Sequence, residues 1–272
     1  MKQVLPVALV AAALGVAVVV GRGGRSRESL LPLSRAVAEH EKALDRGSAV
    51  VFPLSADEER AIGARLDAGM APAPAAPGTP EASAAGLWRE LGMQAANTPL
   101  VQRFRGRYEF RVDPSAGANA FALPGGFVYA TAGLLRRMGS DTDAILFVLG
   151  HEIGHIELGH CADAYRLREG RDPLRSVLGG VASVGRLFAS LHFSASQELE
   201  ADAYGARLLK AAKRDPAASL RAMDALGLRA DSQTKRGPGR VAGEALADYF
   251  TTHPGAWERR ASLEREIARL KR

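Results

Sequence analysis

His151-Glu152-Ile153-Gly154-His155 is the stretch of sequence that decides this fold, because five residues supply two metal ligands and a base. An α-helix turns by about 100° per residue, so side chains at positions i and i+4 lie on one face. Both imidazoles can therefore bind one zinc ion, and Glu152 lies close enough to act on a water molecule that the metal activates. The motif predicts a metal-binding helix at a hydrolytic site.

A helix over about 196–213 is expected to supply the missing ligand, because hydrolytic zinc sites use three protein ligands and keep one position open. Glu198 and Asp202 are four residues apart, so one can bind the metal while the other accepts a hydrogen bond from a ligand histidine. Glu200 lies about 200° from Glu198 around the helix, and we expect it to face solvent. Small residues on the two helices favour a close approach between them: Gly154, Ala201 and Gly205.

Four motifs occur in the order typical of a known family. His-Glu-x-x-His at 151–155 is followed by Glu-x-x-Ala-Asp at 198–202. Asn-Ala-Phe-Ala-Leu-Pro-Gly-Gly precedes both at 119–126, and Thr252-His253-Pro254 follows, with Arg259 six residues after the histidine. In these motifs the chain resembles the zinc metalloproteases that include the CAAX prenyl protease, HtpX and BepA.

The resemblance covers the catalytic unit, and two features depart from it. Family members often carry an arginine directly after the serine that precedes the Glu-x-x-Ala-Asp helix, where this chain has Ala195 after Ser194. The several membrane helices of the prenyl protease and HtpX, and the repeat domain of BepA, have no counterpart in the sequence.

The resemblance implies a role for each matching residue. One zinc ion per chain would be held by His151, His155 and Glu198, with Glu152 as the general base. Asp202 would support a ligand histidine. His253 would stabilise the oxyanion or act as a transient fourth ligand in the resting enzyme, supported by Arg259.

Substrate binding is expected on the segment ahead of the metal helix. By resemblance, the strand at 126–131 is a sheet edge that pairs with an extended polypeptide; the alternative is a structural strand. The residues expected to contact substrate are Asn119, Ala120, Gly126, Phe127 and Val128. We interpret the remaining histidines (His40, His160 and His192) as structural, and Cys161 as a packed thiol.

The expected fold class is α+β and mainly helical: a zincin-like metalloprotease domain with a small antiparallel sheet beside the metal helix. Strands are predicted at 108–113 and 126–131 from their β-forming residues. Ser55-Ala56-Asp57-Glu58 predicts a capping box that opens a helix. Residues 71–85 contain four prolines and predict a linker or exposed insertion. Residues 174–193 are interpreted as a flap or a packed helix.

The N-terminus is predicted to target the chain to a membrane. Lys2 precedes an uncharged run from Val4 to Val20, whose length fits either a signal peptide or a single transmembrane anchor. The predicted organisation is therefore a signal or anchor at 1–21, a juxtamembrane segment at 22–52, and the protease domain at 53–272. This organisation predicts that the protein is located in the cell envelope, where it is either anchored in the membrane or exported to the periplasm. An orientation that faces the cytoplasm stays open.

Together these features predict a zinc-dependent endopeptidase that acts on unfolded or misfolded proteins in envelope quality control. The alternative is a chaperone-like module that binds polypeptides in the same cleft with little proteolysis. The net charge is +6, and its basic excess lies in residues 209–272. We interpret this region as a solvated surface and expect no nucleic-acid partner, because no aromatic platform or recognition motif accompanies it.

Overall fold

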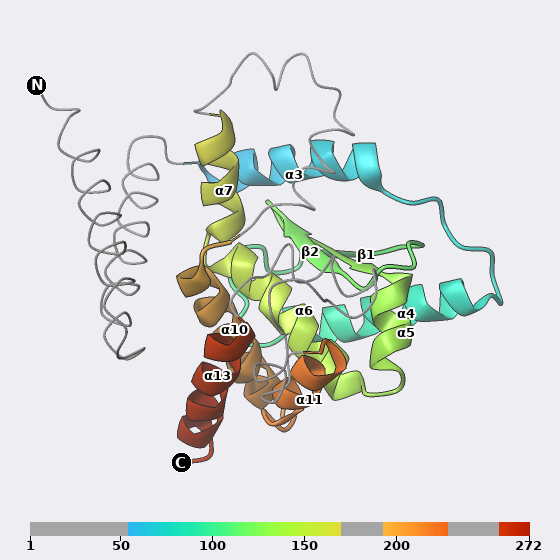
Figure 1. Cartoon of the computed structure of the whole chain (residues 1–272). Helices are drawn as coiled ribbons and strands as arrows, with labels where there is room; N and C mark the ends of the chain where they lie inside the picture. The colour runs from blue at the N-terminus through green and yellow to red at the C-terminus, as the bar shows by residue number, and fades with distance from the viewer. Residues whose placement is uncertain (1–53, 170–192, 228–255) are drawn as a thin grey trace, which may run out of the picture. The chain divides into compact units, whose positions relative to one another are not determined.

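The computed structural model describes residues 54–169, 193–227 and 256–272 (Figure 1), all within one compact unit spanning 41–272. Helices dominate and a small sheet lies among them, so the predicted α+β, mainly helical class is confirmed. The helices are α3 (Ala56–Met70), α4 (Pro80–Ala96), α5 (Ala132–Met138), α6 (Thr142–Glu157), α7 (His160–Glu169), α10 (Ala195–Ala211), α11 (Ala218–Ala225) and α13 (Ala256–Leu270). The strands are β1 (Glu109–Asp113), β2 (Ala120–Leu123) and β3 (Phe127–Thr131).

The sheet is mixed, so the predicted antiparallel pairing holds for β2 and β3 but not for β1 and β3. Its strand order is β1-β3-β2, with β1 parallel to β3 and β2 antiparallel to β3. The segment between the two predicted strands contains a third strand, β2, so the chain reverses direction twice between β1 and β3. The second reversal passes through Gly125 and Gly126, whose φ angles of 80° and 100° suit glycine.

Both faces of the sheet are covered. Phe127 and Tyr129 pack with Ile62 of α3 on one face, while Val128 and Ala130 belong to the main core on the other. This alternation follows from the two-residue period of a strand. In Figure 1, α3 lies on one side of the sheet and α4 and α6 lie on the other.

Hydrogen bonds tie α3 to the sheet through one carboxylate. The Tyr129 hydroxyl donates to Asp67 over 2.5 Å, and the Arg111 guanidinium donates to both oxygens of Asp67, over 3.2 and 3.0 Å. At the other end of α3, the predicted capping box of Ser55 and Glu58 is present. The helix therefore has a defined start and a defined position on the sheet.

The 71–85 segment is only partly the linker that its prolines predicted. Its side chains are mostly exposed, as expected, but α4 already begins at Pro80. Thr79 accepts a hydrogen bond from the Ala82 amide, and Pro80 occupies the first turn, where its missing N–H costs nothing. The last proline of the segment therefore starts a helix.

Helix α6 forms the centre of the core. Every residue from Ala144 to Ile156 is buried, which is typical of a helix packed on all sides. It contacts α10 most extensively, and α11, α4 and β2 surround it. The metal-binding motif therefore lies on the most enclosed helix of the described residues.

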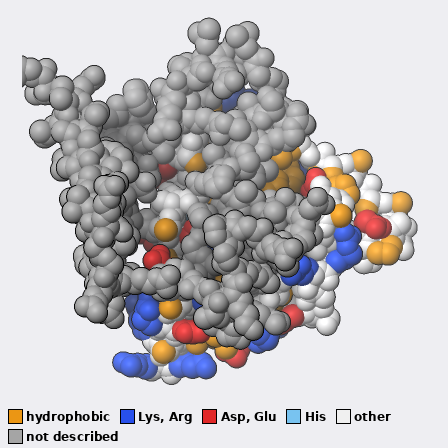
Figure 2. All heavy atoms as spheres, in the orientation of Figure 1, with side chains coloured by type: hydrophobic (Ala, Val, Ile, Leu, Met, Phe, Trp, Pro, Cys, Tyr) orange, Lys and Arg blue, Asp and Glu red, His pale blue; other side chains and the backbone are white. Residues whose placement is uncertain are grey.

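The predicted N-terminal segments 1–21 and 22–52 lie outside the described residues, as does most of 174–193. None of the helices that the structure describes combines the length and the hydropathy needed to cross a membrane. On the face shown in Figure 2, the described Lys and Arg side chains are interspersed with Asp and Glu. Some of the basic C-terminal residues form ion pairs, such as Arg260 with Asp224.

Candidate metal centre

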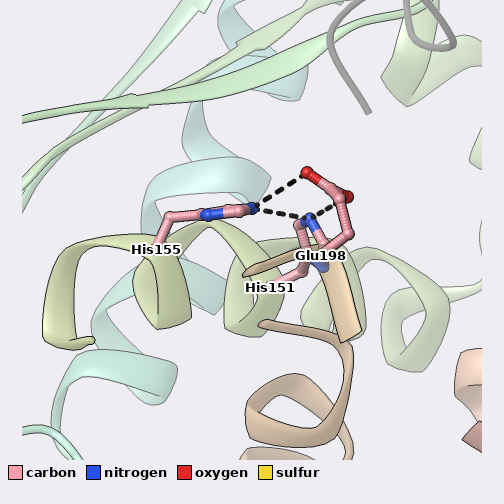
Figure 3. A group of neighbouring side chains, drawn as sticks. All are labelled: His151, His155 and Glu198. Carbon is pink, nitrogen blue, oxygen red and sulfur yellow. Dashed lines mark hydrogen bonds and ion pairs between the residues drawn. The ribbon is translucent and has the colours of Figure 1, made fainter. Parts of the chain in front are cut away.

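His151 and His155 point from one face of α6 toward a shared position (Figure 3). Their Nε2 atoms lie 3.1 Å apart, and both side chains are fully buried. Asp141 caps the start of α6 by accepting from the Ala144 amide, and the apolar residues that follow hold the helix in the core. The i, i+4 spacing therefore places both imidazoles on one face of α6, as expected from the sequence.

Glu198 completes the group from α10, whose start is fixed by the capping box of Ser194 and Gln197. Its two carboxylate oxygens lie 3.5 Å from Nε2 of His151 and 3.5 Å from Nε2 of His155. Tetrahedral zinc with ligands at about 2.0–2.1 Å separates neighbouring ligand atoms by about 3.3 Å. The observed separations of 3.1–3.5 Å are close to this value, with one oxygen of Glu198 facing each imidazole.

Asp202 supports His151 one helical turn along α10. Its Oδ1 atom lies 2.9 Å from Nδ1 of His151, which leaves Nε2 directed at the metal position. Burial alone would raise the pKa of the Asp202 carboxyl, but the nearby Arg259 guanidinium and the His151 ring hold it well below its usual range. Asp202 is therefore an anion that can accept the His151 N–H.

Arg259 reaches both carboxylates from α13. Its Nε and NH2 groups donate to the two oxygens of Asp202 over 2.8 Å, and NH1 lies 2.9 Å from Oε2 of Glu198. The side chain is only 1% exposed. The resemblance assigned Arg259 to the support of His253, which lies outside the described residues together with Thr252 and Pro254. Within the described residues, Arg259 binds Glu198 and Asp202 of α10.

His160 contacts His155, and Glu200 contacts His160; neither contact was predicted. Nδ1 of His160 lies 3.0 Å from Nδ1 of His155, and Nε2 of His160 lies 3.3 Å from Oε2 of Glu200. His160 does not continue the helix of the two ligand histidines, because α6 ends at Glu157 and the chain turns at Gly159, with φ 82°. The Glu200 side chain is 37% exposed, so the expectation that it simply faces solvent was incomplete.

Phe193 also contacts His155 and was missed. Its ring stacks on the imidazole with centroids 3.8 Å apart and an interplanar angle of 19°. The residue precedes the N-cap of α10, so the close packing of α10 on α6 brings it to the metal helix. Its sequence position directly before the serine that precedes the Glu-x-x-Ala-Asp helix is the one signal that could have indicated this contact.

The residues expected to bind substrate lie in β2 and β3 or directly before these strands. The expectation that 126–131 is a sheet edge was wrong, because β3 is the central strand and pairs on both sides. Phe127 and Val128 are buried within it, and Gly126 lies in the turn before it. Asn119 and Ala120 lie at the start of β2, which occupies an outer position of the sheet and packs against α6.

Glu152 and Cys161 are both buried. Glu152 is fully enclosed next to His151 on α6. The Cys161 thiol donates to the Ala122 carbonyl over 3.7 Å, and burial raises its pKa. Cys161 is therefore the packed thiol that was predicted.

Comparison with known proteins agrees with the motifs and their geometry. The sequence matches peptidase family M48 over residues 89–267. It is 33% identical over 147 residues to the mitochondrial metalloendopeptidase OMA1 of Arabidopsis thaliana, covering 52% of this chain and 28% of that protein. It is 28% identical over 162 residues to the metalloprotease LoiP of Escherichia coli strain K12, covering 55% of this chain and 59% of LoiP.

A similar match, 28% identical over 195 residues, relates it to the metalloprotease YcaL of the same organism, covering 66% of this chain and 67% of YcaL. The alignments span less than two thirds of the OMA1 and LoiP relatives. The family match covers more than half of the chain and includes both metal-site helices. The chain therefore belongs to peptidase family M48.

Proposed function

We propose that this protein is a zinc metalloendopeptidase with one zinc ion per chain. The observation that carries the proposal is the meeting of His151, His155 and Glu198, whose ligand atoms all lie within 4.8 Å of one another. Two imidazoles and one carboxylate are the ligand set of hydrolytic zinc sites with an open fourth position. The metalloprotease names of its relatives support the same activity.

The chemistry divides among the residues of α6, α10 and α13. His151, His155 and Glu198 would hold the metal, and a bound zinc ion supplies Lewis acidity toward water and the scissile carbonyl. Glu152 accepts the proton of the attacking water and delivers it to the leaving amine. Asp202 keeps His151 oriented, and Arg259 keeps Asp202 and Glu198 in place. His253 is proposed as the further group that stabilises the oxyanion or closes the resting site.

The proposed substrates are unfolded or misfolded proteins of the cell envelope. An extended polypeptide that pairs with a strand is read mainly through its main chain, so broad specificity is expected. Since β3 is already paired on both sides, an extended substrate would have to pair with a strand other than β3. The apolar run near the N-terminus supports a membrane-anchored or exported protein.

The Glu152→Gln variant tests the proposed activity. It removes the base but none of the proposed metal ligands, so we expect bound zinc by elemental analysis and a loss of casein cleavage of at least about 100-fold. Cleavage by the unaltered protein should stop with a chelator and return with zinc. Undiminished cleavage by the variant would reject Glu152 as the base. If the unaltered protein contains no zinc and does not cleave casein, the proposed function is rejected.

A further inference from the structure

His160 and Glu200 extend the metal centre outward from His155. The contact with His160 is made by Nδ1 of His155, the ring nitrogen that does not face His151 and Glu198. His160 then reaches Glu200 through its own Nε2. Only 4% of His160 is exposed, whereas the Glu200 side chain is partly exposed. The three side chains form a line from the metal position to the protein surface.

The ligand role of His155 determines where the protons lie along this line. A neutral imidazole that binds a metal through Nε2 must carry its proton on Nδ1. That Nδ1–H can donate only to an Nδ1 of His160 that is itself unprotonated, so the proton of His160 lies on Nε2. The Nε2–H of His160 then donates to the ionised Glu200, which can only accept. One arrangement therefore satisfies every donor.

The opposite tautomers of His160 and His155 would prevent His155 from binding a metal. If His160 carried its proton on Nδ1, this N–H would point at Nδ1 of His155 over 3.0 Å. His155 would then have to place its proton on Nε2, where no lone pair would remain for a metal. Glu200 favours the productive arrangement because it attracts the His160 proton to Nε2.

Phe193 does not provide the same control. Its stacked ring restricts the plane of the His155 imidazole. A ring face has no atom that selects which nitrogen carries the proton. His151 obtains that selection from Asp202 directly, whereas His155 faces another histidine.

We propose that His160, held by Glu200, is a positioning residue that keeps His155 in the tautomer and orientation that bind the metal. The inference rests on the proposed metal site. It assigns a role to two residues outside the ligand set, one on α7 and one on α10.

Paired substitutions at His160 separate a hydrogen-bonding role from a packing role. In His160→Asn, the side-chain oxygen is as many bonds from Cα as Nδ1 is, so it can still accept from His155. His160→Phe keeps an aromatic ring and offers no acceptor. We expect the phenylalanine variant to bind zinc about 10–100-fold more weakly in a chelator competition. The asparagine variant should bind close to the unaltered protein.

A second pair tests Glu200. Glu200→Gln removes the charge but keeps an oxygen that can accept from His160, whereas Glu200→Met removes both. We expect weaker zinc binding in the methionine variant, by about tenfold, and near-normal binding in the glutamine variant. Unchanged zinc binding in the methionine variant would overturn the role of Glu200 in this line.

Nitrogen-15 NMR of labelled histidines in the metal-free protein gives a readout independent of catalysis. We expect His155 to be protonated on Nδ1 in the unaltered and His160→Asn proteins and to lose this preference in His160→Phe. Zinc binding by His160→Phe as tight as that of the unaltered protein would overturn the inference and leave the proposed metal site intact. Failure of the unaltered protein to bind zinc would instead reject the metal site, and the inference with it.

Discussion

The Arg259 side chain shows how one residue can hold a buried acidic site together. Glu198 and Asp202 lie one helical turn apart, and both are at most 1% exposed. Two buried carboxylates repel each other and lose their hydration, so they need compensating charge. Arg259 supplies it through two bonds to Asp202 and one contact with Glu198.

Arg259→Met should therefore destabilise the metal-free protein strongly. Removing one partner of a buried ion pair costs about 3–5 kcal/mol, because the remaining charges stay buried without compensation. The measurement is urea unfolding in the presence of a chelator. Arg269→Met is the matched control: Arg269 lies on the same helix with its side chain 72% exposed, and we expect a change within about 0.5 kcal/mol. Equal stability of the two variants would contradict the role given to Arg259.

At the scale of elements, the metal site depends on how closely α10 packs on α6. A Cβ atom added at Gly205 would lie 3.0 Å from Cε2 of Phe147 and 3.1 Å from the backbone nitrogen of His151. A Cβ at Gly150 would lie 3.0 Å from Cα of Gly205, and one at Gly154 would lie 3.1 Å from Cβ of Tyr204. The predicted close approach through Gly154 and Gly205 is confirmed.

Gly205→Ala should weaken both stability and zinc binding. Overpacking costs about 1–3 kcal/mol, and beside the backbone of His151 we expect this cost to exceed the gain of about 1 kcal/mol from replacing glycine in a helix. The contact lies at the backbone of His151, so displacement of α10 moves Glu198 away from the imidazoles. Thermal unfolding and chelator competition measure the two effects.

Gly86→Ala makes the same chemical change in α4, where a new Cβ would have nothing within 4 Å. It should raise stability by up to about 1 kcal/mol and leave zinc binding unchanged. If both alanine variants gained stability equally, the contact at Gly205 would not limit the approach of the helices.

At the scale of the whole molecule, a bound metal would link segments far apart in the chain. Its ligands come from α6 and α10, and Arg259 extends the network to α13. The structure supplies these ligands together only when it is folded, so binding stabilises the native state.

Zinc should therefore raise the unfolding temperature of the full chain. At a free concentration of about 100 times the dissociation constant, binding adds about 2.7 kcal/mol, which corresponds to roughly 5–10 °C for a protein of this size. Differential scanning calorimetry with and without chelator measures the shift. Glu152→Gln should keep the shift and His155→Ala should lose most of it. The same shift in both variants would place the stabilising zinc elsewhere.

The sequence by itself determined the features that depend on local periodicity. The i, i+4 spacing of His151 and His155 placed both imidazoles on one helix face, and the spacing of Glu198 and Asp202 offered one ligand and one support. The capping signal at Ser55 correctly marked the start of α3. Such features follow from the geometry of a single helix, which short stretches of sequence determine.

Only the tertiary structure decided the features that depend on contacts between distant segments. β1 and β3 run parallel because the intervening strand β2 reverses the chain once more along the sequence. Which strands pair depends on their partners in the fold, not on local propensity. The turn at Gly159 brings His160 back to His155, and α13 brings Arg259 to α10. Helical angles cannot predict these contacts, because each crosses a break between helices and depends on how the elements pack.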